Sequence, residues 1–250
     1  PIYNATIIEK LLAKKAIPFA KVTLDELAMG GTGATGHLGK TTNPYDHERM
    51  VGGSSCGSAA VVASAIVPFA LGSDTGDSIR KPASYVGLVG LKPTWGRISR
   101  YGLFPFTPSL DSLGFFTRSV YDSAAILNVV AGYDIHDFTS SKNPADDYTA
   151  DLDKPINGTK IAVIKEIIDS ISDVNIQNKF RETLKIYEEL GATINYVSMD
   201  RHLLKTLFPT YYIISCAEAT SNNANLDGVK FGLNLEGDPF NDSLIKTRSK

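Results

Sequence analysis

Apolar residues recur at the spacing of an amphipathic helix in several parts of the chain. In residues 4–16 and 174–190 they fall every three or four positions, and Gly191, a residue typical of helix C-caps, follows the second segment. The run 58–67 carries no charge, which favours a fully buried helix. The predicted helical segments are 4–16, one or two turns in 23–29, 58–67, 120–131, 174–190 and a helix from Pro209, in its first turn, to about residue 225.

Short apolar runs between turn residues predict the strands. They lie at 17–22, 68–72, 160–165 and 192–198, and we expect 68–72 to be a central strand. The segment 87–91 is either another strand or a tightly packed glycine segment. Strands that alternate with helices in this way indicate an α/β fold. We therefore expect a mixed β-sheet covered by helices on both faces.

Two polar segments interrupt this alternation. Residues 30–58 are rich in Gly, Ser, Thr, Asn and Pro, and a loop of this length inside a compact domain is usually functional or disordered. Residues 134–159 are polar and contain two prolines and a glycine, which predicts a linker or surface excursion. We expect a single domain over residues 1–250 with an excursion at 134–159.

The composition argues against several classes of protein. The 250 residues include 25 basic and 27 acidic side chains, a net charge of −2, whereas surfaces that bind nucleic acid are usually basic. Two cysteines are too few for a disulfide framework, so we expect a reducing, cytoplasmic setting. No apolar run has the length of a membrane span, and the four histidines lack metal-ligand spacing, so neither a membrane segment nor a metal site is expected.

Two phosphate-binding patterns occur in the long loop without their structural context. Residues 31–36 match G-x-G-x-x-G, but a helical turn precedes them and Asn43-Pro44 follows soon after, whereas a dinucleotide site needs a strand before and a helix after. Gly39-Lys40-Thr41 resembles the end of a P-loop, but Ala34 stands where the first glycine is required. Both are interpreted as loop sequence.

Two glycine-rich turns each carry a serine, and no histidine lies near either in the sequence. Ser54 follows Gly52-Gly53, and Ser78 ends the turn Thr75-Gly76-Asp77-Ser78. A serine becomes a nucleophile when a base takes its proton and main-chain amides stabilise the oxyanion that forms. In that interpretation Ser78 attacks, Ser54 relays its proton, and the amides of Thr75, Gly76 and Asp77 hold the oxyanion. The alternative is that both are plain turns, because Gly and Ser favour turns.

The segment 52–80, extended by Leu91-Lys92-Pro93-Thr94-Trp95-Gly96-Arg97, resembles the signature of the amidase signature family. Segments 211–219 and 225–232 resemble, within that family, the A subunits of glutamyl-tRNA(Gln) amidotransferases. The resemblance implies the amidase signature fold and a Ser–Ser–Lys triad. It assigns the acyl-forming serine to Ser78 and the bridging serine, which follows a cis peptide bond, to Ser54. It also implies that Asp74 and Arg80 brace the nucleophile turn and that Tyr211 helps to hold glutamine.

The chain departs from the family pattern at three places. Cys56 and Asp77 stand where the family has glycine. Cys56 is either a small residue in a glycine-like slot or, in principle, a nucleophile. The lysine of the triad lies on a segment well upstream of the signature in the family; Ile17-Pro18-Phe19-Ala20-Lys21 imitates that segment but aligns with a later strand. We therefore expect the lysine to precede Pro1, and the domain to be truncated at both ends.

Three functions remain open on the sequence alone. In the first, the intact protein is the glutaminase component of a tRNA-dependent amidotransferase: it binds no cofactor itself, works with the B and C subunits, meets tRNA mainly through the B subunit, and supplies ammonia to a complex that uses ATP. In the second, it is a stand-alone amidase for small amides. In the third, it is an inactive, degenerate scaffold. The isolated 250-residue piece is expected to be inactive, because a serine without its base is a weak nucleophile.

Overall fold

The computed structural model describes residues 3–228, and the chain divides into two compact units. The first comprises Pro1–Thr149 and Ile214–Lys250, and the second comprises Ala150–Ile213. One boundary between the units falls inside the segment 134–159, which forms no helix or strand, and the other falls between Ile213 and Ile214. The expectation of a single domain with an excursion there stays a prediction.

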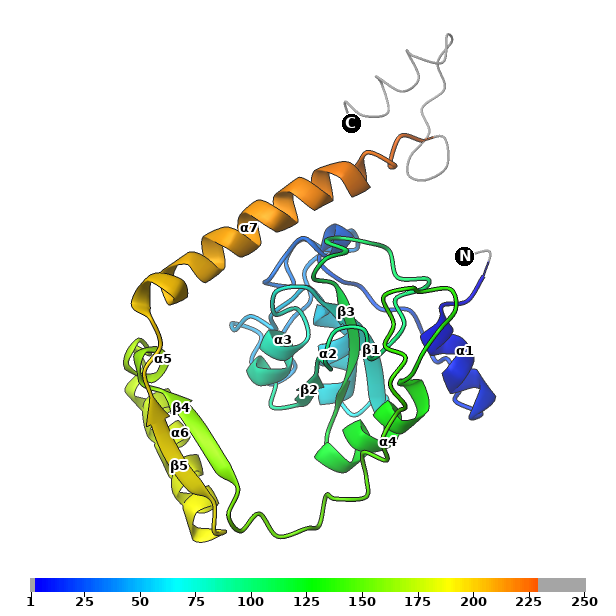
Figure 1. Ribbon diagram of the computed structural model, residues 1–250. Coiled ribbons are helices and arrows are strands. Elements are labelled where there is room, and N and C mark those ends of the chain that lie inside the picture. The colour runs from blue at the N-terminus through cyan, green and yellow to red at the C-terminus, as the bar shows by residue number, and fades with distance from the viewer. Residues whose placement is uncertain (1–2, 229–250) are drawn as a thin grey trace. The chain divides into compact units, whose positions relative to one another are not determined.

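The first unit is built on a three-stranded antiparallel sheet (Figure 1). Its strands are β1 (Phe69–Asp74), β2 (Val89–Leu91) and β3 (Ser112–Thr117), in the order β1-β3-β2. The strand predicted at 68–72 is therefore present, but its expected central place is wrong for the described residues, because β3 occupies the middle of the sheet. Every residue of β3 is buried, as a strand covered on both faces requires.

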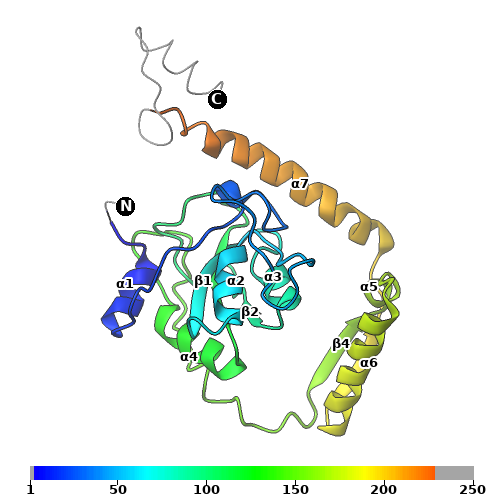
Figure 2. The same cartoon turned by 180° about the vertical axis from the view of Figure 1, so that it is seen from behind.

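Two neighbouring phenylalanines of β3 show how the sheet is covered. Successive side chains of a strand point to opposite faces. Phe115 packs into one hydrophobic cluster, with α1 (Thr6–Ala13) and α4 (Val120–Val130), and Phe116 packs into a second one with α2 (Cys56–Ala63) and α3 (Arg80–Tyr85). In the view from behind, α2 lies over the sheet (Figure 2). The predicted α/β class, with helices on both faces of a sheet, is confirmed.

The helix predicted at 58–67 is displaced and shorter. It is α2, which begins at Cys56 and ends at Ala63, and its first four residues are buried. The backbone leaves the helix soon afterwards: Ala65 has a φ of 57°, in the left-handed region, and Ile66 is 57% exposed. The uncharged run therefore includes a surface turn, which composition alone does not reveal.

The strand predicted at 17–22 is wrong. These residues form no strand in the structure, and Ile17 and Phe19 are 89% and 71% exposed. Pro18 between them has no N–H to donate to a neighbouring strand. The one or two helical turns predicted after this segment are not formed as such: the short turn η1 (Glu26–Ala28) lies there, but Leu27 and Ala28 have φ of 54° and 59°, in the left-handed region.

The second unit is a small βαβ element. Its strands β4 (Lys160–Ile164) and β5 (Thr193–Val197) pair in parallel and are joined through α5 (Lys165–Asp169) and α6 (Val174–Glu189). The side chain of Asp173 accepts hydrogen bonds from the first amides of α6, and Gly191, with a φ of 91°, follows the helix end. The two predicted strands, the helix predicted at 174–190 and the place of Gly191 after it are confirmed, whereas α5 was not predicted.

The last described helix, α7, spans Arg201–Asn223. It begins eight residues before Pro209, which lies inside it, so the predicted start is wrong. The amide of His202 donates to the side chain of Asp200 at 2.7 Å, and this capping contact marks the true beginning. Residues 229–232, part of one segment that carries the family resemblance, lie outside the described residues.

Candidate active site

The two serine turns contact each other. The amide of Ser55 donates a hydrogen bond to the carbonyl oxygen of Ser78 at 3.2 Å, and Ser54 and Ser78 are only 0% and 7% exposed. The peptide bond between Gly53 and Ser54 is cis, as the resemblance implied. Within the described residues, the buried Ser54 hydroxyl has no hydrogen-bond partner. A buried polar group without a partner calls for an explanation. A role of the Ser54 hydroxyl in transferring a proton would supply that explanation.

Asp25 organises the turn of Ser54, a role that was not predicted from the sequence. Its amide donates to the carbonyl oxygen of Ser54 at 3.0 Å. Its fully buried carboxylate accepts from the amides of Thr32, Gly33 and Thr35 at 3.2, 3.0 and 3.0 Å, and from the Thr35 hydroxyl at 2.8 Å. The glycine-rich loop is thereby folded around one carboxylate that lies against the serine turn.

Burial and hydrogen bonding act on Asp25 in opposite directions. Burial disfavours the charged form and raises its pKa, but the hydrogen bonds from Thr35, Gly33 and Thr32 outweigh it. The pKa of the Asp25 carboxyl therefore lies below its ordinary value. Two glycines make room for it: a Cβ at Gly30 would lie 2.3 Å from the Asp25 Cγ, and one at Gly53 would lie 2.1 Å from its Oδ2. Glycine at these two positions therefore lets the main chain lie directly against the Asp25 carboxylate.

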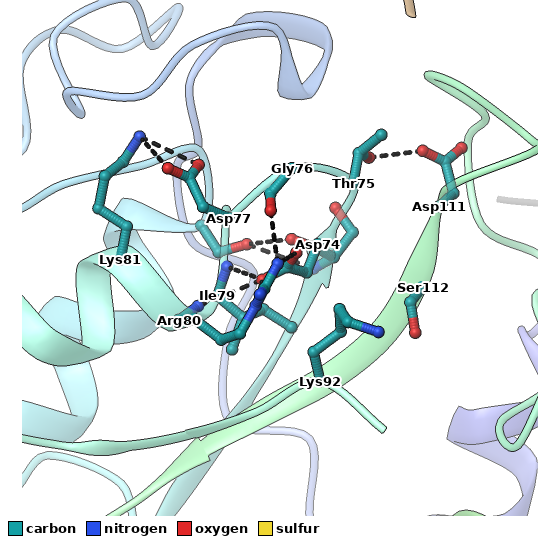
Figure 3. A network of polar contacts seen from close by, with 12 residues as sticks. Asp74, Thr75, Gly76, Asp77, Ile79, Arg80, Lys81, Lys92, Asp111 and Ser112 are labelled. Atoms are coloured by element: carbon teal, nitrogen blue, oxygen red, sulfur yellow. Dashed lines mark hydrogen bonds and ion pairs between the residues drawn. The ribbon is translucent and has the colours of Figure 1, made fainter. Parts of the chain in front are cut away.

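The turn that carries Ser78 is closed by Asp74 and Arg80 (Figure 3). The buried Asp74 carboxylate accepts from the amides of Ile79 and Arg80 at 3.0 and 3.2 Å. It also receives the Arg80 guanidinium, which reaches back to the carbonyl oxygen of Gly76. Hydrogen bonding to Asp74, opposed by burial, raises the pKa of Arg80. The bracing role that the resemblance implied for both residues agrees with these contacts.

Asp111 holds the same turn from its other side. The hydroxyl of Thr75 donates to Asp111 at 2.6 Å (Figure 3). The Asp111 carboxylate also accepts from the amides of Phe106 and Thr107. The C-terminal part of α7 supports that loop, since Asn222 donates to the carbonyl oxygen of Phe106 at 3.0 Å. Asp111 was missed as a site residue because its place beside Thr75 depends on strand pairing.

Four successive amides remain free in this turn. Among the described residues, the main-chain N–H groups of Thr75, Gly76, Asp77 and Ser78 donate to no acceptor. Free amides in a tight turn are the donors that an oxyanion needs. The carboxylate of Asp77 is 53% exposed and pairs with Lys81 at 3.0 Å (Figure 3), so its negative charge is compensated.

Cys56 behaves as a buried packing residue. It is fully buried, and the Thr41 hydroxyl donates to its Sγ at 3.3 Å. Burial raises the pKa of the Cys56 thiol, which disfavours the thiolate that a nucleophile requires. These observations favour the packing interpretation over the nucleophile.

Tyr211 lies on α7 in the second unit, in a cluster with Phe208 and Tyr212. Its role in holding a substrate stays a prediction. Within residues 3–228 no group of three or more metal-ligating side chains is found, and no helix has the length and apolar character of a membrane span.

Comparisons with known proteins place this geometry in a family. The family model described as Amidase matches residues 1–250. The chain is 45% identical over 251 residues to the A subunit of the glutamyl-tRNA(Gln) amidotransferase of Lactiplantibacillus plantarum, covering 100% of this chain and 51% of that protein. It therefore spans about half the length of the curated relatives it matches.

Solved structures give the same result. The crystal structure of the A subunit of the glutamyl-tRNA(Gln) amidotransferase of Thermotoga maritima matches with a TM-score of 0.84 and 38% identity, over 99% of this chain and 52% of that one. The native peptide amidase from Stenotrophomonas maltophilia matches with a TM-score of 0.73 and 27% identity, over 99% of this chain and 55% of that one. The expected amidase signature fold is thus confirmed, and the chain belongs to the amidase family.

Proposed function

We propose that the intact protein hydrolyses the side-chain amide of glutamine, as the ammonia-producing component of a tRNA-dependent amidotransferase. The observation that carries the hydrolytic part is the contact between the two serine turns, with a buried, partnerless Ser54 hydroxyl on one and four free amides on the other, within the described residues. The likeness to proteins named as the A subunit of glutamyl-tRNA(Gln) amidotransferase, at 45% identity, supports the choice of glutamine.

The chemistry proceeds in two steps. The Ser78 Oγ attacks the amide carbon, and its proton passes to Ser54 while Ser54 gives its own to the base. The amides of Thr75, Gly76 and Asp77 hold the oxyanion of the tetrahedral intermediate. Collapse of that intermediate breaks the C–N bond. The proton returns from the base through Ser54 to the amide nitrogen, which leaves as ammonia. Water then attacks the ester on Ser78, and glutamate is released.

The base of this scheme is the lysine that the resemblance implies outside these 250 residues. In the proposed complex, Tyr211 helps to hold glutamine, and ammonia passes to a partner protein that activates glutamate on tRNA with ATP. The B and C subunits are the partners, with tRNA bound mainly by the B subunit, in the cytoplasm. No cofactor is required by the hydrolytic steps themselves.

Replacement of Ser78 tests the nucleophile. In the intact protein with its partner subunits, Ser78→Ala is expected to abolish glutamine hydrolysis, because no ester can form. Amidation of glutamyl-tRNA with free ammonia is expected to continue, because that step does not use Ser78. A variant that still hydrolyses glutamine contradicts the assignment, and Ser84→Ala, on an exposed residue of α3, is the matched control.

A stand-alone amidase is the second candidate, favoured by the structural match to a peptide amidase. The two functions differ in what accompanies the protein. Purification of the intact protein from its own cells is expected to bring stoichiometric partner subunits if it belongs to an amidotransferase. A monomer that hydrolyses small amides without partners supports the second function. An acyl-enzyme formed on Ser78 with an activated ester, in stoichiometric amount, rules out the inactive scaffold.

A further inference from the structure

Three carboxylates surround the turn that carries Ser78, and they differ in what compensates them. Asp74 is paired with Arg80, and Asp111 accepts hydrogen bonds from Thr75, Phe106 and Thr107. Asp77 directly precedes Ser78, and its carboxylate is contacted by the ammonium group of Lys81. Lys81 is therefore the cation in direct contact with the carboxylate nearest to Ser78 along the chain, within the described residues, while Arg80, bound to Asp74, also attracts that carboxylate.

Lys81 is held more firmly than an ordinary surface lysine. Its side chain is 25% exposed, against 53% for Asp77, so most of it is covered. Its Nζ lies close to the glycine-rich loop, because a Cβ at Gly31 would come within 2.7 Å of it. The amide of Lys81 also donates to the carbonyl oxygen of Asp77 at 2.8 Å, which fixes the spacing of the two residues. The ammonium group thus lies between Asp77 and the loop that Asp25 organises.

We propose that Lys81 is a positioning residue of the hydrolytic site: it fixes and neutralises the Asp77 carboxylate, so that the free amides of the Ser78 turn stabilise an oxyanion. The proposal rests on the proposed function. A negative charge next to a developing oxyanion opposes its formation, and the effect is stronger where water is partly excluded. Ion pairs four residues apart and open to solvent on one side add little to the free energy of unfolding. We attribute the importance of this pair to its compensation of the Asp77 charge beside the Ser78 turn.

The test combines substitutions at both positions in the intact protein with its partner subunits. Lys81→Met keeps the aliphatic stem and removes the charge, and it is expected to lower kcat for glutamine hydrolysis by roughly tenfold with little change in KM. Asp77→Asn keeps the main-chain amide and removes the carboxylate, and Lys81→Met added to that variant is expected to change kcat by less than about twofold, because no carboxylate is left to compensate. The double variant is therefore expected to match Asp77→Asn.

Salt provides a readout that a purely structural role would not change. The loss in Lys81→Met is expected to shrink as ionic strength rises, since salt screens the exposed Asp77 carboxylate. Lys179→Met is the matched control, because Lys179 pairs with Glu182 on an exposed face of α6 in the second unit. A loss that persists in the double variant, or that salt does not reduce, overturns the proposal. Hydrolysis by Ser78→Ala would instead overturn the proposed function, whatever the Lys81 variants do.

If Lys81→Met does not fold, a second variant still tests the proposal. Asp77→Glu with Lys81 intact moves the carboxylate outward by one methylene and weakens its fixed contact without removing either charge. The proposal expects a smaller, salt-sensitive loss in kcat for this variant, and unchanged kcat at every salt concentration contradicts it.

Discussion

Arg80 and Asp74 form a two-point contact across the turn that carries Ser78. The Nε and Nη2 atoms of Arg80 donate to the two carboxylate oxygens of Asp74 at 3.1 and 2.8 Å. Asp74 ends β1 and Arg80 begins α3, so one ion pair closes the turn at both ends. A planar guanidinium matches a carboxylate in a way that a lysine ammonium does not.

Arg80→Lys is therefore expected to impair the proposed hydrolysis although it keeps the charge. A lysine ammonium lacks the planar, fixed donors with which the guanidinium holds both Asp74 oxygens and the Gly76 carbonyl group, and small displacements of a reacting group are costly. We expect kcat to fall by about tenfold to a hundredfold, with a loss of about 1 kcal/mol in the free energy of unfolding. Steady-state kinetics and urea unfolding measure both.

The control for this substitution is Arg49→Lys. Arg49 pairs with Asp46 through its Nε, and its side chain is 79% exposed. We expect no change in kcat there. Equal kcat for Arg80→Lys and the unaltered protein would show that the turn keeps its shape without the two-point contact.

Asp25 gives a prediction for pH. Its pKa is lowered in the folded protein, so the carboxylate contributes stability that is present above the unfolded pKa of about 3.9 and is lost as the pH falls through the folded pKa. At pH 7 Asp25→Asn is expected to lower the free energy of unfolding by about 1–3 kcal/mol, because buried amides lose their acceptor. The difference should shrink below about pH 4.

Urea unfolding of the intact protein at neutral and acid pH measures this difference. Asp153→Asn is the control, since Asp153 is exposed. We expect this substitution to change the free energy of unfolding equally little at both pH values. A difference between Asp25→Asn and the unaltered protein that stays constant down to acid pH contradicts the assignment of this carboxylate.

The two cysteines are expected to differ in reactivity. Cys216 is exposed, whereas Cys56 is buried and burial raises the pKa of its thiol. Iodoacetamide should modify Cys216 in the native protein, and Cys56 should react only after unfolding. Peptide mass spectrometry separates the two sites. Native labelling of Cys56 at the rate of Cys216, or loss of hydrolysis in Cys56→Ala with unchanged stability, would revive its role as a nucleophile.

The elements with regular patterns were predictable from the sequence. The helices α4 and α6 carry clear apolar periodicity, and α6 also has a capping residue at each end, so their positions follow from local signals. The segment 17–22 contains Pro18 and Lys21 among its apolar residues, and it pairs with no strand among the described residues. Pro209 is a weaker signal for the start of α7 than the Asp200 cap, which marks the observed beginning.

The site was predictable only in part. The two serines stand in recognisable turns, so a sequence motif is enough to select them. Asp25 and Asp111 were not selected as site residues, since their importance depends on which amides the fold brings to their carboxylates. The pairing of Asp77 with Lys81 has the spacing of neighbouring helical turns, a signal that could have found it from the sequence.

Strand register connects the two acids that hold the Ser78 turn. Asp74 at the end of β1 lies opposite Ser112 in β3, and Asp111 precedes that residue. A slip of one residue between these strands would turn every side chain to the other face and separate the two anchors. The positions of the groups in the proposed reaction thus depend on the main-chain pairing of β1 with β3. Substitutions far along either strand that disturb this pairing should therefore lower kcat before they unfold the protein.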